Sequence, residues 1–110
     1  MASVLNVFKT VTAELTTSSA TLYTAPTGYT TVILMAQISN VTTSSAKVTF
    51  SHYDGTSTTE LLKDFGVPAN DAASATTGKL VIQTGQSITA ESDTANALKV
   101  VLSVLETLNG

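Results

Sequence analysis

The sequence predicts an all-β protein, an antiparallel β-sandwich of jelly-roll or immunoglobulin-like type with about eight strands. Two patterns lead to this prediction. Several stretches alternate apolar and polar residues with period two, and turn residues interrupt them roughly every 8 to 12 residues. No stretch holds a helical period, so crossover helices are not expected and the strands should pair antiparallel. The 110 residues are enough for one core. We therefore expect a sandwich domain over 11–110, preceded by an N-terminal arm or first-strand extension over 1–10.

The strands are expected at 4–15, 20–24, 30–40, 46–53, 58–65, 79–83, 87–91 and 96–107. In the last of these, one face should carry Leu98, Val100, Leu102 and Val104, and the other Lys99, Val101, Ser103 and Leu105. In 30–40, one face should carry Val32, Leu34, Ala36 and Ile38, and the other Thr31, Ile33, Met35, Gln37 and Ser39. The stretch 46–53 alternates as cleanly, with Ala46, Val48 and Phe50 on one side. The first stretch, 4–15, fits no single face.

Turn residues separate these strands. Ala25-Pro26-Thr27-Gly28 suits a type I turn, and Asp54-Gly55 is a hairpin signal. Glycine-containing turns flank the short strand 79–83, which we expect to fold back onto 87–91. Small residues over 71–77 indicate a loop, and 92–96 a polar turn.

Composition excludes several functions. The formal net charge is −3, all five basic residues are lysines spread along the chain, and arginine is absent, which disfavours nucleic-acid binding. No apolar run approaches the length needed to cross a membrane, and the N-terminus has no signal-peptide pattern. Charged residues are only 12% of the chain, about half the usual share, and threonine and serine take their place. Such a surface costs little to desolvate against a partner.

Apolar residues on the second face of two strands predict either scattered surface hydrophobes, cover by the N-terminal arm, or a subunit interface. We favour the interface. The arm, over 2–8, would reach a neighbouring subunit and add a strand to an open sheet edge. The expected contact residues are Val4, Leu5, Val7, Phe8, Ile33, Met35, Val101 and Leu105.

No residue pattern predicts catalysis, a metal or a cofactor, so we expect no enzyme. His52 is the only histidine and cysteine is absent; the neighbouring Asp54 belongs to a turn, and no nucleophile motif is present. Carboxylates at 91–93 or 70–71 could bind calcium, but solvated turns explain them better. Asn40-Val41-Thr42 matches a glycosylation sequon, for which a turn is the simpler interpretation. The three tyrosines at 23, 29 and 53 could stack on sugars, but core or interface positions are commoner.

Several motifs in order resemble a known group of proteins. They are the nonapeptide at 22–30 (Leu-Tyr-Thr-Ala-Pro-Thr-Gly-Tyr-Thr), Ile38-Ser39-Asn40, the segment 80–88 (Leu-Val-Ile-Gln-Thr-Gly-Gln-Ser-Ile), and Leu102-Ser103-Val104-Leu105-Glu106. Together they resemble small β-sandwich virion proteins of tailed bacteriophages, especially phages of aquatic bacteria such as cyanobacteria. The likeness covers most of the chain from about Thr10 onward, and order and spacing carry it.

This resemblance implies assembly rather than chemistry. It favours a capsid decoration (cement) protein that binds the major capsid protein lattice and itself, as a homo-oligomer such as a trimer, and resides in the virion. A neck, tail or fibre component is the alternative, and a carbohydrate-binding adhesion module is a remote one. No nucleic acid, membrane or cofactor is expected as a partner.

Overall fold

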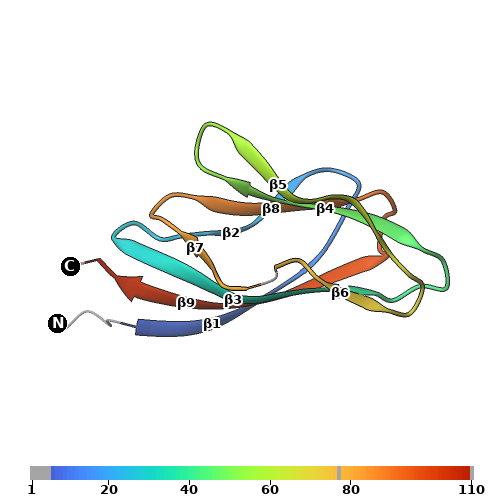
Figure 1. Cartoon of the computed structure of the whole chain (residues 1–110), viewed down its shortest axis with the longest axis horizontal. Coiled ribbons are helices and arrows are strands. Elements are labelled where there is room, and N and C mark those ends of the chain that lie inside the picture. Colours follow the sequence, from blue (N-terminus) through green and yellow to red (C-terminus); the bar gives the residue numbers. More distant parts are fainter. Residues whose placement is uncertain (1–5, 77, 110) are drawn as a thin grey trace.

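Nine β-strands make up the regular structure of the described residues, 6–76 and 78–109, in the computed structural model. They are β1 (Asn6–Glu14), β2 (Ala20–Thr24), β3 (Tyr29–Asn40), β4 (Ala46–Tyr53), β5 (Thr58–Val67), β6 (Ala72–Ser74), β7 (Leu80–Ile82), β8 (Ser87–Ser92) and β9 (Leu98–Leu108). They form two layers that face each other (Figure 1). The predicted antiparallel sandwich is confirmed, with nine strands in this part of the chain rather than about eight.

The layers differ in size. A five-stranded sheet has the order β1-β9-β3-β6, with β7 also pairing with β3, and a four-stranded sheet has the order β2-β8-β4-β5. Every pair is antiparallel. Because β6 and β7 pair with different halves of β3, they share one edge position. The core between the sheets is built mainly from branched aliphatic side chains, with Phe50 as its largest fully buried member.

The inward faces of β9 and β4 agree with the predicted alternation. Leu98, Val100, Leu102 and Val104 are buried, as are Ala46, Val48 and Phe50. Unbroken period-two patterns place all these side chains against the opposite sheet.

Strand β3 departs from the prediction because it contains a β-bulge. Ile33 pairs with Val104 and Met35 pairs with Ser103, so Leu34 is an extra residue between them. The inward face therefore runs through Ile33 before the bulge and through Ala36 and Ile38 after it. The predicted outward position of Ile33 is wrong: its side chain is 0% exposed in the core.

Three local expectations are also wrong. The strand at 79–83 does not fold back onto 87–91, because β7 pairs with β3 and β8 belongs to the other sheet. The expected loop at 71–77 contains β6, which pairs with β3. The first turn is shifted by one residue: the Tyr29 amide donates to the Pro26 carbonyl at 3.0 Å, and Gly28 has φ 85°, a type II rather than a type I turn.

The pairing of β1 with β9 explains why the sequence of the first strand fits no single face. β1 pairs with β9 along its whole length, from Asn6 opposite Thr107 to Glu14 opposite Lys99. Since Val7 lies opposite the buried Glu106 and Phe8 opposite Leu105, apolar side chains occur on both faces of β1. Residues 6–10 of the expected arm thus belong to this strand. Val4 and Leu5 lie outside the described residues, so the arm and its boundary stay a prediction.

Candidate functional site: an apolar outer sheet face

A continuous apolar row crosses the outer face of the five-stranded sheet. Phe8 on β1 lies directly opposite Leu105 on β9, Leu105 opposite Val32 on β3, and Val32 opposite Val81 on β7. Directly opposed residues on neighbouring strands point to the same side of a sheet. The four side chains Phe8, Leu105, Val32 and Val81, called here the outer apolar row, therefore form one strip across four strands.

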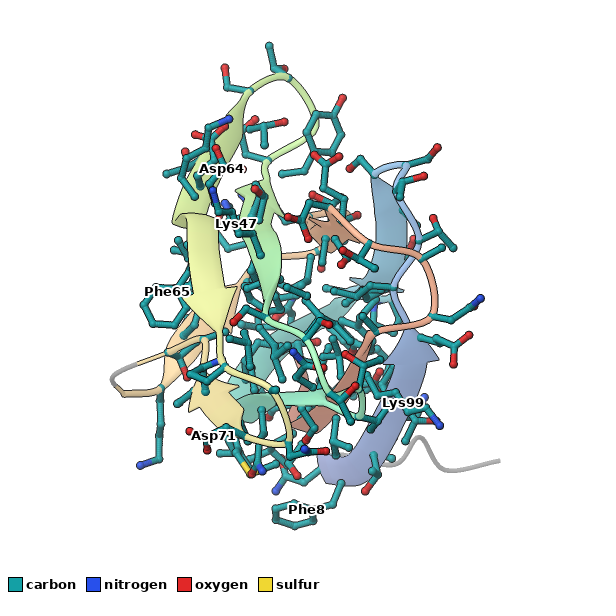
Figure 2. The ribbon with its side chains drawn as sticks, turned by 90° about the vertical axis from the view of Figure 1, so that its right-hand side faces the viewer. Phe8, Lys47, Asp64, Phe65, Asp71 and Lys99 are labelled. Atoms are coloured by element: carbon teal, nitrogen blue, oxygen red, sulfur yellow. The ribbon has the colours of Figure 1, made fainter. Side chains whose placement is uncertain are left out.

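The ends of the row project furthest into solvent. Phe8 is 74% exposed and Val81 is 56% exposed, whereas Leu105 and Val32 are half-buried between their neighbours. Figure 2 shows Phe8 extending from β1 away from the rest of the sandwich. Met35 and Val101, each 37% exposed, add apolar surface beside the row. Large exposed apolar side chains gathered in this way are typical of interaction surfaces.

The remainder of this face is nearly free of charge. Two further sets of directly opposed residues lie beside the row on β1, β9 and β3. The nearer set is Thr10, Ser103 and Met35, and the next is Thr12, Val101 and Gln37. Glu14 and Lys99, which face each other across β1 and β9, are the charged residues among the outward positions of β1, β9 and β3. Because their charges are opposite, this face presents little net charge to a partner.

The predicted contact residues divide into three groups. Phe8, Met35, Val101 and Leu105 lie together on the outer face, Val7 and Ile33 point toward the core side, and Val4 and Leu5 are outside the described residues. Whether the first group contacts a partner stays a prediction. Val7 and Ile33 do not belong to the outer face.

Sequence reasoning missed Val32 and Val81. The bulge at Leu34 reversed the apparent face of Val32, and Val81 was assigned no face. The apolar triplet Leu80-Val81-Ile82, with its middle residue outward in a strand, was the available signal for Val81.

Beneath the row, a polar cluster anchors β1. Glu106 follows Leu105 on β9, points inward and is 3% exposed. Its carboxylate accepts a short hydrogen bond from the Tyr23 hydroxyl and pairs with the Lys9 ammonium at 3.1 Å. The Tyr23 hydroxyl also lies 2.8 Å from the Thr31 hydroxyl. Burial, and then the hydrogen bond to Glu106, raise the pKa of Tyr23 well above its usual range.

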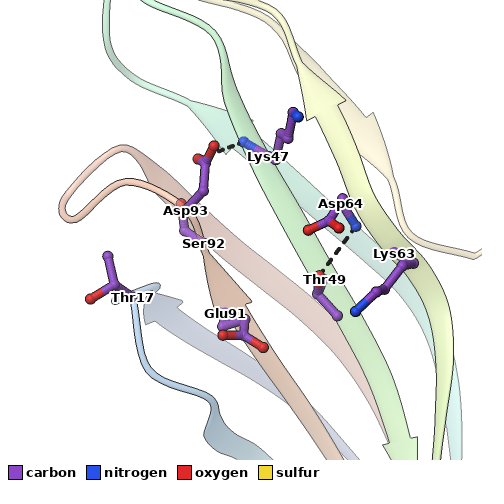
Figure 3. A pocket seen from close by; sticks show the side chains of 8 residues that line it. All are labelled: Thr17, Lys47, Thr49, Lys63, Asp64, Glu91, Ser92 and Asp93. Carbon is purple, nitrogen blue, oxygen red and sulfur yellow. Dashed lines mark hydrogen bonds between the residues drawn. The ribbon is translucent and has the colours of Figure 1, made fainter.

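A polar depression, about 420 Å³ in volume, lies on the outer side of the four-stranded sheet. Figure 3 shows the side chains that line it: Thr17, Lys47, Thr49, Lys63, Asp64, Glu91, Ser92 and Asp93. Its best-placed polar groups hold strands together, since Asp93 Oδ1 accepts the Lys47 amide at 2.8 Å and Thr49 Oγ1 accepts the Asp64 amide at 3.2 Å. The amide hydrogen bond from Lys47 lowers the pKa of Asp93.

The remaining candidate residues have structural partners. His52 Nε2 lies 3.1 Å from Gln86 Oε1, while Asp54 Oδ1 accepts the Thr56 and Ser57 amides in the hairpin turn. These two amide hydrogen bonds, that from Ser57 foremost, lower the pKa of Asp54. His52 and Asp54 therefore do not form a catalytic pair here.

Two further candidates are tied into the fold. The buried Asn40 amide nitrogen donates to the carbonyls of Ser44, at 2.8 Å, and Val67, at 3.0 Å, which leaves the sequon asparagine inside a turn. The Tyr23 hydroxyl bonds across to the five-stranded sheet, so this tyrosine does not offer its ring with the others as a sugar platform.

Within 6–76 and 78–109, no cluster of three or more histidine, cysteine, aspartate or glutamate side chains is arranged to hold a metal ion. The same part of the chain contains no helix long and apolar enough to cross a membrane.

Comparisons with known proteins bear on the fold. No protein-family model matches the chain, and no curated protein sequence matches it significantly. Solved structures do match. A chain of the acid-stable capsid of Helicobacter pylori bacteriophage KHP30 has a TM-score of 0.59 at 15% identity, over 97% of this chain and 90% of that one. A chain of the disulfide-linked endospore appendages of Bacillus has a TM-score of 0.54 at 13% identity, over 96% and 88%.

A third match is to VP2 of the subviral particle of infectious bursal disease virus. Its TM-score is 0.52 at 14% identity, and the match covers 96% of this chain but 33% of that one. At such identities the likeness shows the fold alone. The chain is a β-sandwich of a type that occurs in viral capsids and in a bacterial surface appendage.

Proposed function

We propose that this chain is a structural protein of a virion, most specifically a capsid decoration protein, and that its outer apolar face is a subunit contact in the assembly. The observation that carries the proposal is the outer apolar row, which leaves Phe8 and Val81 largely exposed on a sheet face of almost no net charge. A monomer gains nothing from exposing these side chains, whereas a protein in a permanent assembly buries them.

The fold likeness to a phage capsid chain and to a viral capsid protein supports this role. The surface chemistry supports it further, because few charges must be desolvated when the face is covered. The polar groups that could suggest an enzyme are occupied in turns and between strands, so catalysis forms no part of the proposal.

A fibre, neck or tail component of a virion is the second candidate. The likeness to the Bacillus endospore appendages favours it, because that match places the same sandwich in a filament. Those appendages are disulfide-linked, and this chain has no cysteine, so any filament formed here would need non-covalent contacts.

The deciding experiment is quantitative mass spectrometry of density-purified virus particles produced by the organism or virus that encodes the chain. Decoration predicts a copy number comparable to that of the shell protein, and a neck or fibre role predicts a small fraction of it. Absence from the particles would overturn both. Cryo-electron microscopy of the same particles would then place the subunit.

The contribution of the N-terminal segment needs its own variant. Deleting residues 1–8 would remove Phe8 together with the segment, whereas deleting residues 2–5 keeps all of β1. If an arm reaches a neighbour, the shorter deletion lowers occupancy on particles while the stability of the isolated domain stays the same. Unchanged occupancy would reject the arm.

A further inference from the structure

We infer that the partner covering the outer apolar face is a second copy of this chain, packed sheet against sheet around a two-fold axis parallel to the strands and midway between β9 and β3. The inference deepens the proposed function, on which it rests for taking this face as the subunit contact. It adds the identity of the partner and the geometry of the contact.

The size of the face suits such a pair. The long strands β1, β9 and β3, about 4.8 Å apart and roughly 30–40 Å long, span roughly 600 Å² together with the short edge strands β6 and β7. A standard stable interface buries about 800 Å² on each partner, so this face with its protruding side chains approaches that size. A sheet face of these dimensions matches another sheet face better than it matches a narrow peptide.

The order of side chains in the row is self-complementary. An axis parallel to the strands reverses the row of the second copy, so that the large Phe8 ring lies over the small Val81 side chain and Leu105 lies over Val32. Large side chains then meet small ones at both ends of the contact, as close packing requires. An axis along the row would instead place the two Phe8 rings on each other and leave both Val81 side chains facing.

The charges also allow this arrangement. After the same rotation, Lys99 on β9 faces Ser39 on β3 of the second copy, and Glu14 on β1 faces the side of β6. No like charges are opposed, and the Glu14–Lys99 pair stays at the rim. The interface is isologous, the arrangement most common among homo-oligomers.

Cross-linking tests the geometry directly, because the chain contains no cysteine and engineered thiols are therefore unique. In the proposed dimer, residue 8 of one copy lies about 10 Å from residue 81 of the other, whereas the two copies of residue 8 lie roughly 17 Å apart. A short bismaleimide should therefore cross-link an equimolar mixture of F8C and V81C, and leave F8C alone mostly unlinked. Cross-linking of F8C alone, with no F8C–V81C adduct in the mixture, would overturn the proposed axis.

Sedimentation of the full chain over a concentration series tests the partner. We expect a monomer–dimer equilibrium, with Phe8→Ser or Val81→Ser weakening the dimer about tenfold or more, as truncation of a central apolar contact does. Val41→Ser is the matched control, since Val41 is exposed but lies beyond the outer face, and it should leave dimerisation unchanged.

A wild-type chain that stays monomeric at every concentration, or a dimer indifferent to Phe8→Ser and Val81→Ser, would overturn the inference. Melting curves of each variant separate lost folding from lost pairing. The outcome is also separable from the proposed function: binding to particles without dimerisation would reject the pair alone, and a dimer absent from particles would reject the virion role alone.

Discussion

Replacing Tyr23 with phenylalanine removes a hydroxyl that donates a hydrogen bond to Glu106. Glu106 is the one buried carboxylate among the described residues. Glu106 is 3% exposed and has two partners beyond the strand ladder, the Tyr23 hydroxyl and the Lys9 ammonium. In Tyr23→Phe the carboxylate keeps Lys9 but loses its hydroxyl donor.

The expected cost follows from the type of hydrogen bond lost. A hydrogen bond to a charged group contributes about 1.5–3 kcal/mol. The Thr31 hydroxyl, which lies opposite Glu106 on β3, can turn toward the carboxylate and recover part of this. We therefore expect the free energy of unfolding to fall by about 2 kcal/mol, which moves a urea midpoint by roughly 1 M for a domain of this size.

Urea unfolding followed by circular dichroism is the assay, with Tyr53→Phe as the matched control. The Tyr53 hydroxyl donates to the Gly55 carbonyl at 3.0 Å in an exposed turn, so its loss should change stability by less than about 0.5 kcal/mol. Equal, small effects of the two substitutions would refute the idea that Tyr23 supports a buried carboxylate.

The same pair of proteins makes a pH prediction. Because the folded-state pKa of Tyr23 is raised, its contribution is complete below the ordinary tyrosine pKa of 10.0 and is lost as the pH rises above that value. Wild type should therefore lose more stability than Tyr23→Phe between neutral pH and strongly alkaline pH. Lysine deprotonation is common to both proteins, so the difference between their curves isolates Tyr23.

Three further predictions concern other parts of the sandwich. Ile33→Ala should destabilise the fold by about 2–5 kcal/mol in urea unfolding, and Met35→Ala by less than about 1 kcal/mol; the reverse order would contradict the bulge at Leu34. Asn40→Ala should lower the free energy of unfolding by about 2–3 kcal/mol, because it leaves the Val67 carbonyl and the Thr42 amide without their partner. The exposed Asn109 is the control, and a smaller effect of Asn40→Ala than of Asn109→Ala would argue against this role of Asn40. Since the folded-state pKa of Asp54 is lowered from 3.8, its contribution to stability is present above that pH and lost as the pH falls below it. The melting temperature of Asp54→Asn should therefore fall less than that of the wild type as the pH is lowered through this range. An equal fall in both proteins would reject the role of the Asp54 carboxylate in the turn.

Uninterrupted alternation made some of the sandwich predictable. From Leu98 to Val104 in β9 and from Ala46 to Phe50 in β4 every second residue is apolar, and tertiary packing had only to cover the face that the pattern defined. The hairpin from β4 to β5 was also predictable, because Asp54 and Gly55 favour a turn locally and Gly55 has φ 100°.

Other parts depended on information outside the local sequence. Residues 32–36 of β3 are all apolar, so no alternation could reveal an extra residue at Leu34 or the change of face that it causes. β7 and β8 lie on either side of a tight turn in which the Gln86 amide donates to the Gln83 carbonyl, yet they enter different sheets because β3 offers β7 a free edge. Turn residues predict where the chain reverses, but they do not predict which strand the chain pairs with after the turn.

The candidate site was predictable in part for the same reason. Met35, Val101 and Leu105 stood out as second-face apolar residues, and Phe8 as part of an irregular first strand. Their neighbours Val32 and Val81 become visible only through strand order, because the row joins four strands that are distant in the chain. A row of this kind is a property of sheet register, which a single strand pattern does not encode.

The inner polar cluster and the outer apolar row depend on one register. A shift of β1 by one residue would turn Phe8 toward the core side and Val7 outward. Glu106 is buried whereas Lys9 is half-exposed, and such a shift would leave the buried carboxylate without its cation, so this ion pair disfavours it. The carboxylate also binds Tyr23 from the opposite sheet, which ties edge strand β1 to both layers through β9. The polar cluster around Glu106 thus holds in place the Phe8 ring that projects from the outer face.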